Sequence, residues 1–282
     1  MNWLGIVLGN PLILLAAALL LNGAASAWAF RRRSVDAGGA AAGALVGTLI
    51  FVSGGPFFWL VLMAFFLSST ALGRFGGNKR EQAEAIHEKS GRRDFVQVVA
   101  NGGIGMISAV LFRLTGDPAW AVGFAVSFAV ASADTWGSEA GILSRGDPVS
   151  LLTLRPVPRG ISGGVSVLGL AASLGGALFI AVIFAAENLA VARTPTGFAA
   201  LAVYVAACGF IGSIVDSLLG ATLQAQYAVE TGSAILITER PSTNGVRNRL
   251  VRGLALVNND VVNLASCALV TAAAVLLYPL IA

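Results

Sequence analysis

Long runs of apolar residues alternate with short polar stretches along the whole chain, and each run is long enough to cross the ~30 Å hydrocarbon layer of a membrane as a helix. The pattern predicts about eight membrane-spanning helices, over 3–29, 37–54, 57–73, 95–115, 118–136, 161–186, 197–220 and 257–281. In the second, Gly39, Gly43 and Gly47 recur at every fourth position, a spacing that lets helices approach closely; a ligand-facing stripe is the other interpretation. The expected fold is therefore an all-α, polytopic integral membrane protein.

Basic residues fall almost entirely in alternate loops. If both termini lie outside the membrane, sixteen of the eighteen Lys and Arg residues are in inside loops, and only Arg113 and Arg193 are outside. Cytoplasmic loops carry such an excess, so the pattern favours eight spans over seven or nine. The inside connections 74–94, 137–160 and 221–256 are long, and long loops are often functional. We therefore expect a multi-pass protein of the cell (inner) membrane whose active site faces the cytoplasm.

Composition agrees with this prediction. Hydrophobic residues make up 56% of the chain and charged residues 11%, with a mean hydropathy of +0.81, whereas soluble domains are about 25% charged. The net charge of +4 is explained by membrane anchoring, so no nucleic acid partner is expected. Cys208 and Cys267 lie in apolar runs and are expected to pack, and His87, as the only histidine, excludes a histidine-ligated metal cluster. We expect one membrane-embedded domain, 1–282, in which 1–56 carries no motif and 57–282 is the catalytic core.

Polar residues gather near the predicted cytoplasmic ends of four helices. They are Asp94, Gln97 and Asn101 on one face of the fourth helix, Asp134 on the fifth, Asp216 on the seventh, and Asn259 and Asn263 on the eighth. A carboxylate within a span costs about 2.5–3.5 kcal/mol and usually faces a cavity or a partner. Asp134 and Asp216 lie at C-terminal helix ends, where the helix dipole disfavours negative charge, so a cation is expected nearby. The alternative for Asp94 is an N-cap. The set predicts one shared polar pocket.

Two inside loops combine basic residues with glycine. They contribute Arg155, Arg159, Gly160, Ser162, Gly163 and Gly164 from "LRPVPRGISGGVS" and Lys79 from "GRFGGNKR". Glycine-rich turns and helix N-termini bind phosphate through backbone N–H groups, although a basic patch at the membrane surface is the simpler alternative. Mg²⁺ takes one or two carboxylates together with substrate phosphates, and Arg and Lys neutralise charge on a phosphoryl group. Acids and basic loops on one surface therefore favour a Mg²⁺–nucleotide site.

Five motifs carry a resemblance to a known family. In chain order they are "GRRDFVQVVANGG", "ADTWGSEAG", "PRGISGGVS", "GSIVDSLLGATLQ" and "NNDVVNLAS". Together they resemble the membrane family that includes plant phytyl-phosphate kinase. The resemblance implies a kinase that uses CTP to phosphorylate an isoprenyl monophosphate, of the phytyl or geranylgeranyl type, to the diphosphate. The chain is also distantly similar to the CTP-using dolichol kinase and CDP-diacylglycerol synthase, although the lysine frequent in their basic stretch is replaced by Arg155 or Arg159.

This hypothesis gives each candidate residue a role. Asp134, Asp216 and Glu139 are the expected Mg²⁺ ligands and, with Asp94, the expected catalytic acids. The residues expected to bind nucleotide or phosphate are Lys79, Arg93, Gln97, Asn101, Arg155, Arg159, Gly160, Ser162, Gly163, Gly164, Asn259 and Asn263. A strong general base is not required, because the acceptor is already a phosphate anion.

Two other functions stay open on the sequence alone. A cytidylyltransferase that makes a CDP-lipid would use the same residues. Intramembrane acids and glycine-broken helices would suit a membrane transporter. Transport sites, however, lie near the bilayer midplane, whereas these polar residues are predicted at one side. The expected partners are an isoprenyl-phosphate lipid, a nucleoside triphosphate and membrane lipid, and assembly into a homo-oligomer is left open.

Overall fold

The computed structural model describes residues 10–74, 86–89, 91–192, 195–231 and 234–280. Most of this part of the chain is helical. The helices are α2 (Pro11–Arg31), α3 (Ala37–Leu72), α5 (Phe95–Thr115), α6 (Pro118–Gly141), α7 (Val167–Ala192), α8 (Pro195–Thr222) and α9 (Asn259–Leu277), and a 3₁₀ turn, η1 (Tyr278–Leu280), follows α9. All of these α-helices except α6 are long and apolar enough to cross a membrane. The all-α membrane architecture is confirmed, whereas the count of eight spans and the outside termini stay predictions.

Helix α3 folds back on itself at Gly55. Its 36 residues would extend about 54 Å as a straight helix, far more than the ~30 Å membrane core. Gly55 has a φ of 73°, a left-handed conformation that glycine adopts readily, and Pro56 follows it. Both halves of α3 consequently contact the same residue, Arg93. A carbon added to Gly39 would collide with the carbonyl of Arg93, whose guanidinium lies over the Phe66 ring. The two helices predicted from the sequence are therefore the two arms of α3.

Helix α6 lies at the centre of the bundle, in contact with α3, α5, α7, α8 and α9. Every residue from Val122 to Ala133 is buried. A helix surrounded by other helices has no lipid-facing surface to keep apolar, and small or hydroxyl residues such as Ser127 and Ser132 favour close packing. This environment explains why α6 is less apolar than the helices around it.

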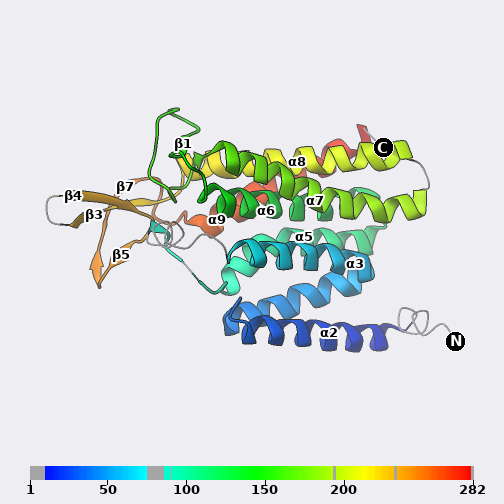
Figure 1. Cartoon of the computed structure of the whole chain (residues 1–282). Helices are drawn as coiled ribbons and strands as arrows, with labels where there is room; N and C mark the ends of the chain where they lie inside the picture. Colours follow the sequence, from blue (N-terminus) through cyan, green and yellow to red (C-terminus); the bar gives the residue numbers. More distant parts are fainter. Residues whose placement is uncertain (1–9, 75–85, 90, 193–194, 232–233, 281–282) are drawn as a thin grey trace.

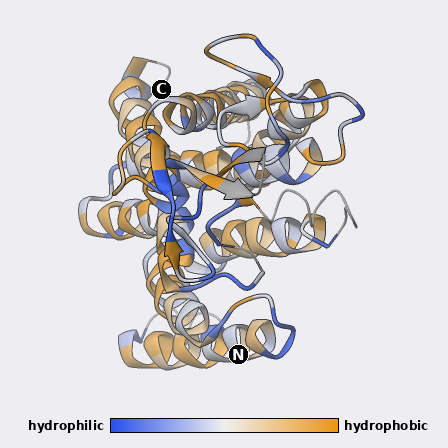
Figure 2. Cartoon of the chain, turned by 90° about the vertical axis from the view of Figure 1, so that its left-hand side faces the viewer, coloured by the Kyte–Doolittle hydropathy of each residue, from blue (hydrophilic) through white to orange (hydrophobic). Residues whose placement is uncertain are grey.

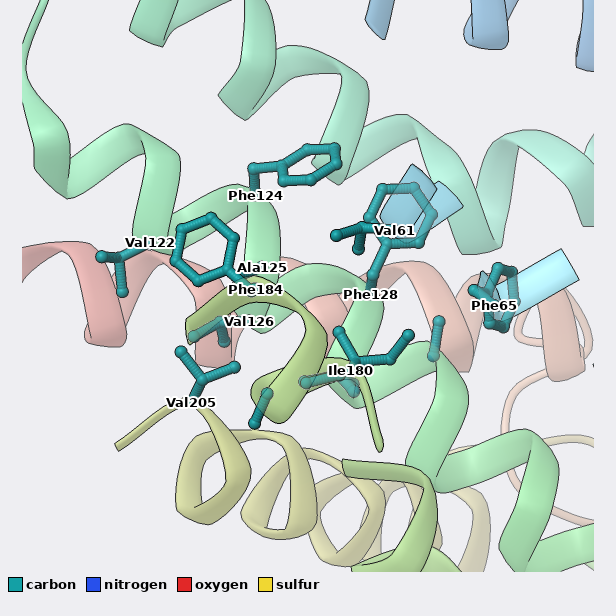
Figure 3. Packing of buried hydrophobic residues seen from close by; sticks show 14 of the residues in the cluster. Val61, Phe65, Val122, Phe124, Ala125, Val126, Phe128, Ile180, Phe184 and Val205 are labelled. Atoms are coloured by element: carbon teal, nitrogen blue, oxygen red, sulfur yellow. The ribbon is translucent and has the colours of Figure 1, made fainter. Parts of the chain in front are cut away.

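Aromatic side chains fill the middle of the bundle (Figure 3). The rings of Phe58 and Phe124 stack with centroids 4.0 Å apart, and the rings of Phe124 and Phe128 are 5.0 Å apart. Ile180 of α7 and Val205 of α8 are fully buried in the same cluster. The close-packed middle fixes the helices relative to one another, so that side chains at their ends have defined positions.

Short β-strands form at one end of the bundle. They are β1 (Val149–Ser150), β2 (Gly164–Val165), β3 (Gln226–Thr231), β4 (Ala234–Thr238), β5 (Ser242–Thr243), β6 (Val246–Arg247) and β7 (Arg249–Arg252). Strand β3 pairs antiparallel with β4 and β7, β1 pairs with β2, and β5 pairs with β6. The strands lie together, opposite the end where α2 begins and η1 is found (Figure 1). The sequence predicted this region only as long loops, so the small sheet is a correction.

The end of the molecule that carries the strands is also its polar end. Figure 2 views it directly: stretches of hydrophilic residues lie on the loops and strands, while the helices are mostly hydrophobic. This arrangement leaves one end of the bundle in which polar groups from several helices can meet.

Candidate functional site

A cavity of about 320 Å³, called the polar cavity below, opens among the helix ends beside the strands. Its walls come from the starts of α5, α7 and α9, the ends of α6 and α8, the segment before α5, and the glycine loop before β2. The predicted site residues that line it are Arg93, Gln97, Asn101, Asp134, Glu139, Arg159, Gly160, Ser162, Gly163, Gly164, Asp216, Asn259 and Asn263. The structure thus brings residues from all five motifs into one space.

Asp134 and Asp216 reach the polar cavity from two different helices, α6 and α8. Asp216 is only 8% exposed, and the hydroxyl of Ser266 on α9 donates to its Oδ2 over 2.9 Å. When the amide of Asn263 is turned with its nitrogen toward Asp216, that nitrogen donates to the same oxygen over 3.1 Å. Two carboxylates that face one cavity offer the hard oxygen ligands that Mg²⁺ prefers.

Asp94 caps helix α5 and does not line the polar cavity, which corrects its predicted place in the pocket. Its Oδ1 accepts from the backbone N–H of Gln97 over 2.8 Å, and Oε1 of Gln97 accepts from the backbone N–H of Asp94 over 3.0 Å. This reciprocal pair is a capping box. The amide side chains of Gln97 and Asn101, on the same helical face, do line the cavity.

Lys89 links the starts of α5 and α9 at the rim of the polar cavity. Its Nζ lies 2.7 Å from Oδ2 of Asp94 and 2.6 Å from Oδ2 of Asp260. Burial alone would lower the pKa of Lys89, but hydrogen bonds to Asp260 and Asp94 outweigh it and raise this pKa. Burial alone would raise the pKa of Asp94, but the hydrogen bonds from Lys89 and from the N–H of Gln97 lower it. Both shifts stabilise the charged forms, so the three groups form an ion-paired strap.

Glu239, just after β4, holds the glycine loop in place. Its Oε1 accepts from the backbone N–H of Ser162 over 3.1 Å and also from the Ser162 hydroxyl. Burial raises the pKa of Glu239, and the nearby His87 and Ser162 offset part of that effect. Gly163 has a φ of 82° and packs so closely on Ala221 of α8 that a side chain would collide. The Ser162 donors predicted to bind phosphate are therefore engaged by a carboxylate of the chain itself.

Arg159 lines the polar cavity, but its guanidinium is directed at backbone carbonyls. Nη1 donates to Ile142 and Ser144 over 3.3 and 2.5 Å, and Nη2 donates to Arg145 and Gly146, each over 3.1 Å. Arg159 therefore fixes the chain that leaves α6, and its predicted role as a phosphate ligand stays a prediction. Cations near a helix C-terminus also interact favourably with its dipole.

Two basic candidates remain. Arg155 is exposed and does not line the polar cavity, so its phosphate contact stays a prediction. Lys79 lies outside the described residues.

Replacing Arg159 and Arg155 separately tests these assignments. We expect Arg159→Ala to lower the free energy of unfolding by about 2 kcal/mol, because four carbonyls lose a charged donor. Arg155→Ala is the matched control and should change it by less than about 0.5 kcal/mol. Unfolding in detergent and limited proteolysis after α6 measure both effects. Equal stability and equal protease resistance of the two variants would contradict the assignment.

Acidic side chains outnumber basic ones in the lining of the polar cavity among the described residues. Its acidic side chains are Glu88, Asp134, Glu139, Asp216, Glu239 and Asp260, and its permanently cationic side chains are Lys89, Arg93 and Arg159. Within the part of the chain that the structure describes, no three His, Cys, Asp or Glu side chains form a ready-made metal-binding group, so Glu139 does not join Asp134 and Asp216 in one. The donor set fits a divalent ion that is held by two carboxylates and completed by substrate oxygens.

Sequence reasoning missed several polar residues of this site, and four of them make contacts that shape it. Lys89, Glu239 and Asp260 are held by contacts between distant parts of the chain. His87, which had been set aside, lines the cavity with Nε2 2.8 Å from the carbonyl oxygen of Gly160. Of these four residues, Asp260 could have been found from the sequence, because it lies inside the motif "NNDVVNLAS".

Comparison with known families identifies the family of this chain. Residues 20–271 match the family described as "Integral membrane protein DUF92". The chain belongs to this family. The match covers the helices that form the polar cavity, so the cavity is a feature of the part of the chain that defines DUF92 membership.

Three relatives extend along most of the chain. Protein PGR of Arabidopsis thaliana is 29% identical over 275 residues, which cover 91% of this chain and 93% of the relative. An uncharacterized membrane protein of Synechocystis is 26% identical, with 90% of each chain covered. Protein VTE6, chloroplastic, of Arabidopsis thaliana is 25% identical over 98% of this chain and 72% of its own. No solved structure matches the chain.

Proposed function

We propose that this DUF92 protein is a CTP-dependent kinase that phosphorylates an isoprenyl monophosphate to the diphosphate at the cytoplasmic face of the membrane. The observation that carries the proposal is the meeting of Asp134 and Asp216, from two helices, in one polar cavity with the amides of Gln97 and Asn101. The five motifs that resemble the phytyl-phosphate kinase family support the choice of lipid and nucleotide. The Synechocystis relative is itself described as a membrane protein, which is consistent with a site at the membrane.

The charge of the polar cavity favours a metal-bound nucleotide over a free one. An unneutralised polyphosphate would be repelled by the excess of carboxylates in the lining. Asp134 and Asp216 are the residues that would hold Mg²⁺. When bound, Mg²⁺ supplies neutralisation of the charge on the phosphoryl oxygens and a template for their orientation.

The chain's own side chains would bind and orient the reactants. Arg93, Gln97 and Asn101 present a cation and two amides to the cavity, which suits the phosphate of the lipid. An oxygen of that phosphate forms a bond to the terminal phosphorus of CTP as the bond between this phosphorus and the bridging oxygen breaks, and CDP leaves. Because the attacking oxygen is already an anion, catalysis needs orientation and charge stabilisation more than proton removal.

Cytidylyl transfer is the second candidate, because the same acids and amides would serve attack at the innermost phosphorus of CTP. It would give a CDP-lipid and pyrophosphate. Transport is less well supported, since a transport site is expected near the middle of the membrane, where the described residues form the apolar cluster of Figure 3.

Labelled CTP distinguishes these functions. Purified protein is incubated with geranylgeranyl phosphate or phytyl phosphate, Mg²⁺, and CTP that carries ³²P at either the outermost or the innermost phosphorus. We expect label from the outermost position, and none from the innermost, in the lipid product. Label from the innermost position in the lipid would show that the protein is a cytidylyltransferase and not a kinase. Label in the lipid from neither position, with any nucleotide tested, would contradict both.

A further inference from the structure

A second, smaller cavity, called the apolar cavity below, lies between α2, α3 and α5. Its volume is about 100 Å³, and most of its lining is apolar or small, including Ala25, Gly43, Leu62, Phe65 and Val98. Eight of the nineteen lining residues come from α2 and the first arm of α3, which carry none of the five motifs. The structure therefore gives these two helical segments a site that the sequence did not predict.

The apolar cavity adjoins the polar cavity, with which it shares four lining residues. Arg93, Gln97, Asn101 and Thr135 line both spaces, so the small cavity ends in a cation, two amides and a hydroxyl group. One ligand that occupied both would need an apolar part joined to an anionic or strongly polar head. A prenyl phosphate has this form.

Small residues keep the apolar cavity open. Gly43 of α3 faces α2, and a carbon added to it would lie 3.3 Å from Oγ of Ser26. Gly47, one turn further along, packs directly against Asn22 and leaves no space. The glycine stripe of α3 thus serves close helix packing at Gly47 and borders a cavity at Gly43.

We propose that the apolar cavity binds the isoprene units next to the phosphate of a prenyl phosphate, while the phosphate lies at Arg93, Gln97 and Asn101. This inference rests on the proposed function in that it adds a tail site to the same lipid substrate. A geranylgeranyl chain is larger than the cavity, so only the units near the phosphate fit inside it. The tail gains little from leaving water, because it starts in lipid; shape and packing inside the cavity therefore determine selection and orientation.

Photolabelling without nucleotide tests the tail site independently of catalysis. The probe is geranyl monophosphate with a diazirine in the isoprene unit next to the phosphate, and mass spectrometry locates the label. We expect the label on residues of α2, α3 and α5 that line the apolar cavity. Gly43→Leu and Ala25→Leu should each reduce labelling about tenfold, because the added side chain would fill the space that the isoprene unit occupies.

The matched control is Gly23→Leu, since Gly23 is exposed on α2 and a carbon added to it would have no neighbour within 4 Å. It should label like the unchanged protein. Label on other helices, or equal labelling of the Gly43→Leu, Ala25→Leu and Gly23→Leu variants, would overturn the tail site. Label in the apolar cavity, with no product from labelled CTP, would support the tail site and contradict only the kinase. Product from labelled CTP, with the photolabel elsewhere, would support the kinase and contradict only the tail site.

Discussion

Asp134→Asn and Asp216→Asn should each reduce the rate of phosphoryl transfer by about 10²–10³-fold, the loss that follows removal of one preorganised electrostatic group at a reacting centre. Asparagine keeps the shape of the side chain but removes the charge that would hold a divalent ion. The effect should appear mainly in kcat and in the Mg²⁺ dependence, with little change in the amount of folded protein. Steady-state rates at several Mg²⁺ concentrations measure it.

Asp117→Asn is the matched control for these variants. Asp117 caps the other end of α6, where its Oδ1 accepts from the backbone N–H of Ala119 over 2.9 Å. Asparagine caps helices about as well as aspartate, so stability and rate should both be retained. If all three Asp→Asn variants lost activity equally, or if none did, the placement of Asp134 and Asp216 in the active site would be refuted.

Lys89→Met should lower the free energy of unfolding by about 2 kcal/mol, because it leaves the carboxylate of Asp260 without its cation at a position that is only 4% exposed. The expected loss is smaller than for a fully buried pair because solvent screens Lys89, whose side chain is 31% exposed. Adding Asp260→Asn to Lys89→Met should recover more than half of the lost free energy of unfolding. Denaturation in detergent measures both, and failure of the double variant to recover would contradict the ion-paired strap.

The strap also predicts a pH dependence. The pKa of Asp94 is lowered in the fold, so its contribution is present above the unfolded pKa near 4 and is lost as the pH falls through the folded value. The pKa of Lys89 is raised, so its contribution is complete below the unfolded pKa of about 10.4 and is lost as the pH rises through the folded value. The stability difference between the unchanged protein and Lys89→Met should therefore be largest between these limits.

The apolar runs predicted the helices well because a membrane imposes one length and one chemistry on every span. The hairpin within α3 was also foreseen as two spans, since Gly55 and Pro56 interrupt the run. The strands were not foreseen. Residues 226–231 pair with both 234–238 and 249–252. Each strand is short and is flanked by polar residues, so the sequence does not indicate which segments pair.

The candidate site was predictable where residues lie on helices, because helical spacing fixes which side chains share a face. Gln97, Asn101, Asp134 and Asp216 all line the polar cavity as the spacing indicated. Loop residues were harder, since a loop residue's role depends on which distant group it meets. Arg159 donates to carbonyls at the end of α6, and the glycine loop meets Glu239, 77 residues away in the chain.

Binding of Mn²⁺, which accepts the same oxygen ligands as Mg²⁺, measures the central claim most directly. Electron paramagnetic resonance would follow Mn²⁺ added to the purified protein with and without CTP. We predict one nucleotide-dependent population of bound Mn²⁺, which weakens strongly in Asp134→Asn and in Asp216→Asn and persists in Asp117→Asn. Nucleotide-dependent Mn²⁺ binding that is equal in all four proteins, or no such binding in the unchanged protein, would contradict the account.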